Sequence, residues 1–251
     1  MKNYIKAENL KFKRTFSRRM IIFVPLLNIV FSFLMNIQFF VSGTFNWWSI
    51  IFMPVMISLF CSLSHQKEKR ASNYNGTYSL PVDLEKLWYA KIIIIMIYSL
   101  ISQIVFLIFI FLMGFVIADL SNVSLSIIAA SILLWITSLW QIPLCLYVAR
   151  KWGFTIAVMF NLIGALVLGI MPASRAFWWF IPWSWPIRMM CPAIGIHPNG
   201  LLLEKNDPLL SWAVVPSAVF ISIVLLLILA FLTSRSFAPA KDYRTNKQEA
   251  M

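Results

Sequence analysis

The sequence predicts an all-α integral membrane protein with six transmembrane helices, and two observations carry this prediction. Hydrophobic residues make up 61% of the 251 residues and charged residues only 12%, a balance that a bilayer can accommodate and a soluble domain cannot. The apolar runs are about 20 residues long and do not alternate, which indicates helices and not the shorter strands of a membrane barrel. We expect one polytopic domain over residues 1–251.

The N-terminal segment, residues 1–19, contains seven Lys and Arg residues and a single Glu. At helical spacing Ile5, Phe12 and Phe16 share a face, which favours an interfacial helix on the inner leaflet over a frayed basic tail. The apolar run that follows lacks a small-residue cleavage site, so we expect it to be retained as the first span.

Six apolar runs separated by polar links predict the spans. The link 42–46 is short and uncharged, which predicts a helical hairpin formed by the first two spans. We expect the six spans at about 20–41, 47–63, 92–117, 125–148, 154–171 and 209–232.

The distribution of basic residues predicts the orientation. Eighteen of the 21 Lys and Arg residues lie in segments on the side of the N-terminus, and three lie in the segment 172–208 on the other side. The positive-inside rule therefore predicts that both termini are cytoplasmic. Topology and anionic lipid headgroups explain the net charge of +12, and we expect no nucleic-acid partner.

The outer segment 172–208 is far longer than the other outer links and has six aromatic residues among nine. An aromatic belt at the headgroups explains most of its tryptophans. The segment is also apolar and broken by six prolines, which favours a re-entrant outer segment between spans 5 and 6. We expect Trp178, Trp179, Trp183 and Trp185 to lie at this outer interface.

The six predicted spans contain no Asp, Glu, Lys, Arg or His, which argues against intramembrane proteases, metal sites and proton-coupled carriers. We therefore expect no catalytic residue and no metal. The polar residues left as candidates for a substrate path are Asn28, Asn36, Gln38, Gln103, Gln141 and Asn161. For any one of them, a hydrogen bond between helices is the favoured interpretation.

Gly164 and Gly169 have the glycine spacing of a Walker A motif, but Ile170 and Met171 follow them in place of the Lys and Ser or Thr that bind phosphate and magnesium. We expect this chain to bind no cofactor. If ATP drives its function, ATP and Mg²⁺ would be bound by a separate ATPase subunit.

The polar loop 64–91 separates the second and third spans. It contains Glu68-Lys69-Arg70, then Gly76-Thr77 and Leu80-Pro81-Val82, and ends at Lys91. This run and the layout of the whole chain are similar to those of ABC-2 type exporter permeases. The resemblance implies a coupling helix that contacts a cleft of an ABC ATPase through Glu68, Lys69, Arg70, Gly76, Thr77, Leu80 and Pro81. The inserted run 71–75 departs from the family pattern and leaves the register of that contact open.

Within that family, the chain length and the Trp-rich outer segment resemble the lantibiotic-immunity permeases, which give bacteriocin self-protection. This resemblance implies a bacterial plasma-membrane exporter that expels a cationic peptide from the bilayer. Its partners would be an ABC ATPase subunit and a second permease, related or identical. Two alternatives stay open, an ABC-2 permease for another drug, lipid or antibiotic, and a membrane scaffold without transport. An intramembrane enzyme is disfavoured by the absence of catalytic groups.

Overall fold

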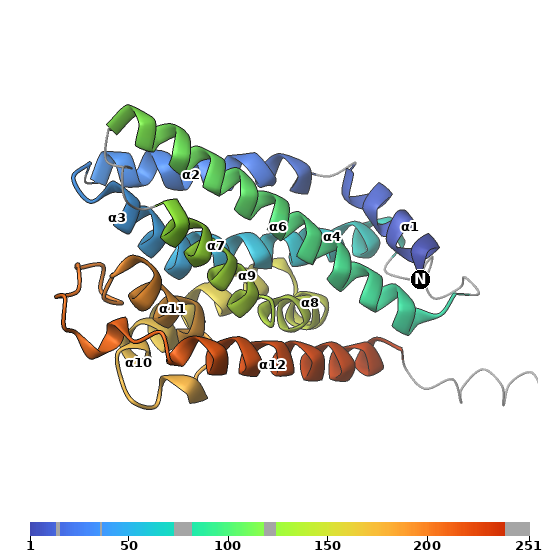
Figure 1. Cartoon of the computed structure of the whole chain (residues 1–251). Helices are drawn as coiled ribbons and strands as arrows, with labels where there is room; N and C mark the ends of the chain where they lie inside the picture. Colours follow the sequence, from blue (N-terminus) through green and yellow to red (C-terminus); the bar gives the residue numbers. More distant parts are fainter. Residues whose placement is uncertain (14–15, 36, 73–81, 118–123, 239–251) are drawn as a thin grey trace, which may run out of the picture.

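The computed structural model of the chain describes residues 1–13, 16–35, 37–72, 82–117 and 124–238, which form helices joined by turns, with no strand among them. The long helices lie side by side in a bundle (Figure 1). The α-helices are α1 (Lys2–Lys13), α2 (Ser17–Met35), α3 (Phe40–Trp47), α4 (Met53–Ser72), α6 (Leu84–Ile117), α7 (Ser124–Ser138), α8 (Gln141–Trp152), α9 (Phe154–Ile163), α10 (Ile170–Ala173), α11 (Ser184–Ile194) and α12 (Val214–Phe237). Short π or 3₁₀ turns are η1 (Trp48–Phe52), η2 (Gly164–Gly169), η3 (Trp178–Phe180) and η4 (Pro208–Leu210).

Five helical stretches in the described part of the chain are long and apolar enough to cross a membrane. A sixth span results if α7 and α8, which are bent by 43° relative to each other, count as one. The five stretches are Ser17–Met35, Phe40–Gln66, Leu84–Gly114, Phe154–Ala173 and Val214–Phe237. For the described residues, the prediction of an all-helical, multi-pass membrane protein is confirmed.

The first hairpin turn lies earlier than predicted. The sequence places it at 42–46, but α2 ends at Met35 and α3 already begins at Phe40. The polar residues that suggest a loop are accommodated inside the helix, because the hydroxyls of Ser42 and Thr44 donate hydrogen bonds to the carbonyls of Phe39 and Phe40, at 3.0 and 2.6 Å. The predicted boundaries of the first two spans, 20–41 and 47–63, are therefore wrong at this turn.

The last span begins later than predicted. The sequence places its start at residue 209, but η4 occupies Pro208–Leu210 and α12 begins at Val214. The Asp207 carboxylate accepts a hydrogen bond from the backbone N–H of Leu209 at 2.7 Å, which stabilises the 3₁₀ turn in place of a continuous helix. At its other end α12 continues to Phe237, beyond the predicted end at 232.

The bundle has two ends of different character, and in Figure 1 α1 lies at one and α11 at the other. At the first end, which we call the basic end, α8 contacts α12, and the Arg150 guanidinium donates a hydrogen bond to the carbonyl of Ser236 at 2.9 Å. At the other, which we call the aromatic end, α11 packs against α3 and α7. The basic end consists of residues 1–13, 64–72, 82–91, 149–154 and 233–238, and the aromatic end of residues 40–47 and 172–213.

Candidate functional site

A buried cluster of four charges joins α1, α4 and α6 at the basic end. The Lys91 ammonium group lies 3.0 Å from a Glu8 oxygen and 2.8 Å from a Glu68 oxygen, and the lysine side chain is fully buried. The Lys11 ammonium group lies 2.6 Å from Glu8 and 2.8 Å from the same oxygen of Glu68. Two lysines balance two carboxylates, so the cluster is neutral although only Lys11 reaches solvent.

The N-terminal helix α1 contributes to this cluster because one of its faces packs against α6. The ring of Phe12 is buried, 4.7 Å from the Tyr98 ring between centroids, and the Tyr98 hydroxyl donates to the Asn9 side chain at 2.9 Å. Glu8 lies four residues before Phe12 and therefore on the same helix face. The helix α1 ends at Lys13, short of the predicted 1–19, and α2 already begins at Ser17, so Phe16, which is 53% exposed, does not share this buried face. The position of α1 on a membrane surface stays a prediction.

The charges of the cluster keep the Glu68 carboxylate ionised. Burial alone would raise the pKa of this carboxyl, but the positive charges of Lys91 and Lys11, and their hydrogen bonds to it, lower its pKa to about 2. Burial lowers the pKa of Lys11, yet the two carboxylates outweigh that effect and raise it above its usual value of 10.5. Lys11 and Glu68 therefore stabilise each other's charged forms at neutral pH.

The cluster joins the two ends of the loop 64–91. Glu68 lies near the start of that loop, on α4, and Lys91 is its last residue, on α6. Asp83, at the start of α6, accepts a hydrogen bond from the Lys86 N–H at 3.1 Å and caps the helix. The backbone N–H of Asp83 donates to the Tyr4 hydroxyl at 3.0 Å, so α1 contacts both flanks of the loop.

Two of the predicted ATPase-coupling residues are described with their side chains. Glu68 belongs to the charge cluster, and Lys69 is exposed beside it on α4. The other predicted coupling positions lie outside the described residues, namely the side chain of Arg70 and residues Gly76, Thr77, Leu80 and Pro81. Their contact with an ATPase stays a prediction.

The four tryptophans proposed for the outer face occupy different environments at the aromatic end. Trp179 is 52% exposed, whereas Trp185 is 4% exposed and its indole N–H donates to the Trp179 carbonyl at 3.1 Å. Trp178 and Trp183 are partly buried against the core. The structure therefore exposes Trp179 and uses Trp185 to hold the start of α11.

The glycine pair with Walker-like spacing serves packing. Gly164 and Gly169 lie in η2, where a Cβ on Gly164 would come within 2.5 Å of the Trp183 indole. A Cβ on Gly169 would lie 2.7 Å from the Ile187 side chain. Because glycine has no Cβ, α11 and the residue before it can approach η2 closely.

One of the predicted polar residues, Asn161, connects three parts of the bundle. Its amide donates to the Pro54 carbonyl and to the Gln141 side chain, both at 2.8 Å. Its side-chain oxygen accepts the indole N–H of Trp183 at 3.1 Å. The residue is fully buried, so these contacts fix α4, α8, α9 and the start of α11 against one another.

The other polar candidates lie in different parts of the bundle. The Asn28 amide donates to the Thr44 carbonyl at 3.2 Å, and Gln103 accepts the Trp48 indole N–H at 2.7 Å. Both are buried and hold neighbouring helices together, as expected of polar residues between membrane helices. Gln38 lies in the turn before α3, and Asn36 lies outside the described residues. A role for these residues along a substrate path stays a prediction.

Sequence reasoning missed several residues that organise these sites. Glu8 is a single acid among basic residues, and its only signal is the i, i+3 spacing to Lys11. Lys91 is the last residue of the polar loop 64–91 in the sequence and directly precedes an apolar run, but its burial has no signal there. Arg188 was counted as an outer charge, but it is 4% exposed on α11 and donates to the Leu209 carbonyl at 2.7 Å.

Comparison with known families agrees with this architecture. Residues 4–168 match the sequence model of the ABC-2 family transporter protein. The matched region includes the charge cluster and the loop 64–91, and it ends before the segment 172–208. No curated protein and no solved structure matches the chain. Since the family match covers more than half of the 251 residues, the chain belongs to the ABC-2 family of transporter membrane proteins.

Proposed function

We propose that this chain is the permease subunit of an ATP-driven exporter and that its basic end faces the cytoplasm. The observation that carries the proposal is the buried charge cluster, which ties α1, α4 and α6 together at the two ends of the loop 64–91. Family membership implies an ABC ATPase as partner. In this proposal ATP and Mg²⁺ bind to that subunit, and a second permease, related or identical, completes the transport path.

The cluster suits the transmission of force from the loop to the bundle. A movement of the loop pulls on Glu68 at one side and on Lys91 at the other. Separating either residue from the cluster leaves an unpaired charge in a buried site, which is costly. The helices therefore move together with the loop instead of detaching from it.

We infer that the cargo enters from the membrane and leaves at the aromatic end, and that it is a cationic peptide of the lantibiotic type. The length of the chain and its Trp-rich outer segment support this choice of cargo. Exposed aromatic side chains at this end suit a peptide inserted in the outer leaflet. These are Phe177, Trp179 and Phe180, which are 51%, 52% and 69% exposed.

The re-entrant placement of the outer segment is part of this proposal. Helix α11 has 11 residues, so it is about 16 Å long, roughly half the thickness of the hydrocarbon core. Its residues from Ser184 to Ala193 are all buried in protein. A short helix that is surrounded by protein in this way can enter a bilayer without exposing its polar backbone to lipid.

The coupling role is tested by Glu68→Gln in vesicles that contain the chain, its ATPase and a cationic peptide of the lantibiotic type. We expect ATP hydrolysis to continue while ATP-dependent peptide release falls at least several-fold, because the cluster loses a negative charge. Glu85→Gln is the matched control, since Glu85 is exposed on the first turn of α6 and outside the cluster. Replacing Gly76 and Thr77 should uncouple transport in the same way. Unchanged peptide release by the Glu68 variant and the loop variant would overturn the coupling role.

The role of the outer aromatics is tested by Trp179→Ala, because this exposed side chain can be removed without opening the core. We expect weaker peptide binding and weaker protection of cells against the peptide. Trp152→Ala, at the basic end and 50% exposed, is the control and should change neither. The wider replacement of Trp178, Trp179, Trp183 and Trp185 by alanine should abolish both, and normal protection by that variant would exclude the proposed exit.

A further inference from the structure

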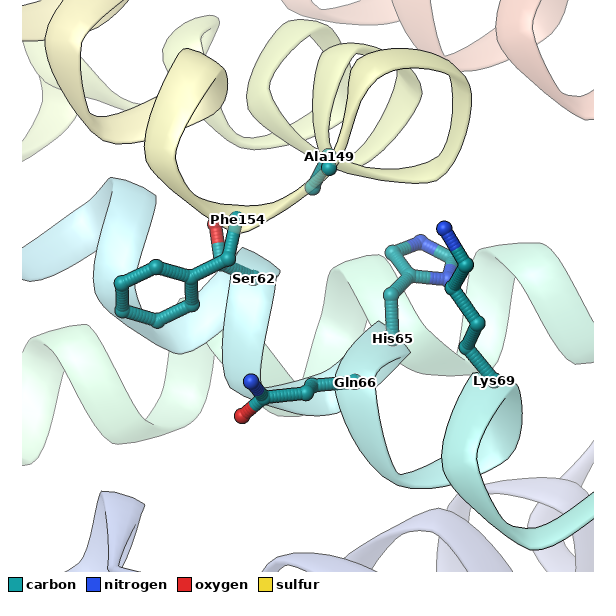
Figure 2. Close-up of a pocket in the computed structure, with 7 residues that line it drawn as sticks. Ser62, His65, Gln66, Lys69, Ala149 and Phe154 are labelled. Carbon is teal, nitrogen blue, oxygen red and sulfur yellow. The ribbon is translucent and has the colours of Figure 1, made fainter.

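A pocket of 310 Å³ opens at the basic end, between α4 and the corner that joins α8 to α9. Its α4 wall is a stripe at helical spacing, formed by Ser62, His65, Gln66 and Lys69, and Figure 2 shows His65 and Lys69 extending to the same side of that helix. The opposite wall consists of Ala149, Gly153 and Phe154. None of these lining residues belongs to the charge cluster.

The pocket lies where membrane spans end. The apolar stretch Phe40–Gln66 ends among its lining residues, and the stretch Phe154–Ala173 begins there. Arg150, Lys151 and Trp152 follow Ala149 directly, and basic and aromatic residues are typical of the level of the lipid headgroups. The pocket is therefore accessible to the headgroup of a lipid in the adjacent leaflet.

The lining favours an anion. Lys69 contributes an exposed positive charge, and Ser62, His65 and Gln66 contribute hydrogen-bonding groups, whereas no carboxylate is among the lining residues that the structure describes. The neighbouring Glu68 is directed to the cluster, where it pairs with Lys11 and Lys91. A volume of 310 Å³ is at the lower end of the range of small-molecule sites and suits a phosphate with a small alcohol.

We propose that this pocket binds the phosphate of an anionic phospholipid headgroup through Lys69 and the polar stripe of α4. Free phosphate has the same chemistry, but the position at the ends of two spans favours the lipid as its source. A bound headgroup would connect α4 to the α8–α9 corner, next to the residues that we assign to coupling. The inference concerns a resident lipid and holds whatever the cargo is.

The test is a titration of the detergent-purified full chain with dioctanoyl-phosphatidylglycerol, followed by thermal unfolding. Dioctanoyl-phosphatidylcholine and inorganic phosphate are separate arms. We expect saturable stabilisation by the anionic lipid, a much weaker response to the zwitterionic lipid and none to millimolar phosphate. Lys69→Gln should weaken the apparent affinity for the anionic lipid about fivefold, the effect of one lysine near an anionic surface. Lys69→Glu should weaken it further.

The matched control is Lys6→Gln, which removes the same charge from an exposed position on α1 at the same end of the bundle. It should leave the lipid affinity within twofold of the wild type. An unchanged affinity in Lys69→Glu, or an equal response to both lipids, would overturn the proposed site. Stabilisation by inorganic phosphate equal to that by the anionic lipid would overturn the lipid as the ligand.

Discussion

Replacing Lys91 with Met should destabilise the chain more than any other single charge removal at the basic end. The lysine side chain is fully buried and pairs with Glu8 at 3.0 Å and with Glu68 at 2.8 Å. Methionine fills a similar volume, so the change removes the charge and retains most of the packing. Two buried carboxylates would then share the single positive charge of Lys11, and the cluster would carry a net negative charge.

The pKa of Glu68 gives the magnitude. Burial raises that pKa, but Lys91 and Lys11 together lower it from 4.5 to about 2. That net difference, in which burial opposes the two lysines, corresponds to about 3 kcal/mol in favour of the ionised carboxylate, and Lys91 and Lys11 share the attraction behind it. Lys91 also pairs with Glu8, which this figure does not include. Removing one partner of a buried ion pair costs about 3–5 kcal/mol, so we expect a loss of about 3 kcal/mol.

The assay is the free energy of unfolding of the purified chain in mixed micelles, measured by denaturant titration. Lys86→Met is the matched control, because Lys86 lies five residues earlier on α6 and forms an exposed pair with Asp83. The double variant Lys91→Met, Glu68→Gln restores neutrality and should recover a large part of the loss. Equal stabilities for Lys91→Met and Lys86→Met, or no recovery in the double variant, would refute the account of the cluster.

Three further predictions follow from the same contacts. The pKa of Glu68 is lower in the folded chain than in the unfolded chain. Its contribution to the free energy of unfolding should therefore persist above pH 4.5 and disappear as the pH falls towards 2. In an acid titration of stability, Lys91→Met should flatten this pH dependence. Gly164→Ala should destabilise by about 1–3 kcal/mol in thermal unfolding, whereas Gly43→Ala, with open space at its Cβ, should not; equal effects would contradict the packing role. Asn161→Leu breaks three hydrogen bonds and should lower the free energy of unfolding by about 2 kcal/mol, more than Asn28→Leu, which breaks one. Equal losses in the two variants would contradict the role of the Asn161 network.

The class of the fold could be predicted from sequence because length and hydropathy alone decide it. Apolar runs of this length are kept from water by crossing a bilayer as helices, and the structure has helices at each predicted run. The boundaries could not be predicted, because polar residues are ambiguous in a membrane helix. Thr44 suggests a loop in the sequence, yet its hydroxyl bonds to the carbonyl one turn earlier and the helix continues.

The charge cluster could be predicted only in part, because it depends on packing between distant segments. The place of Glu68 in the loop marks it as a candidate, but its partners Lys11 and Lys91 lie 57 residues before it and 23 after it. Nothing in the spacing along the chain reports that α1 packs on α6. Phe12, which anchors that packing, was assigned correctly to the apolar face of α1, and this was the available clue.

The most direct test of an ATP-driven permease is co-purification of the chain with a co-expressed ABC ATPase, followed by measurement of ATP hydrolysis in lipid vesicles. We predict a stable complex whose rate of ATP hydrolysis rises several-fold when a lantibiotic peptide is added. In the complex that contains Glu68→Gln, we predict hydrolysis without peptide release. Two results would contradict the proposal and favour a scaffold without transport. One is a chain that purifies without an ATPase under conditions that preserve its fold. The other is a complex whose rate of ATP hydrolysis does not change with any membrane-inserted cargo tested.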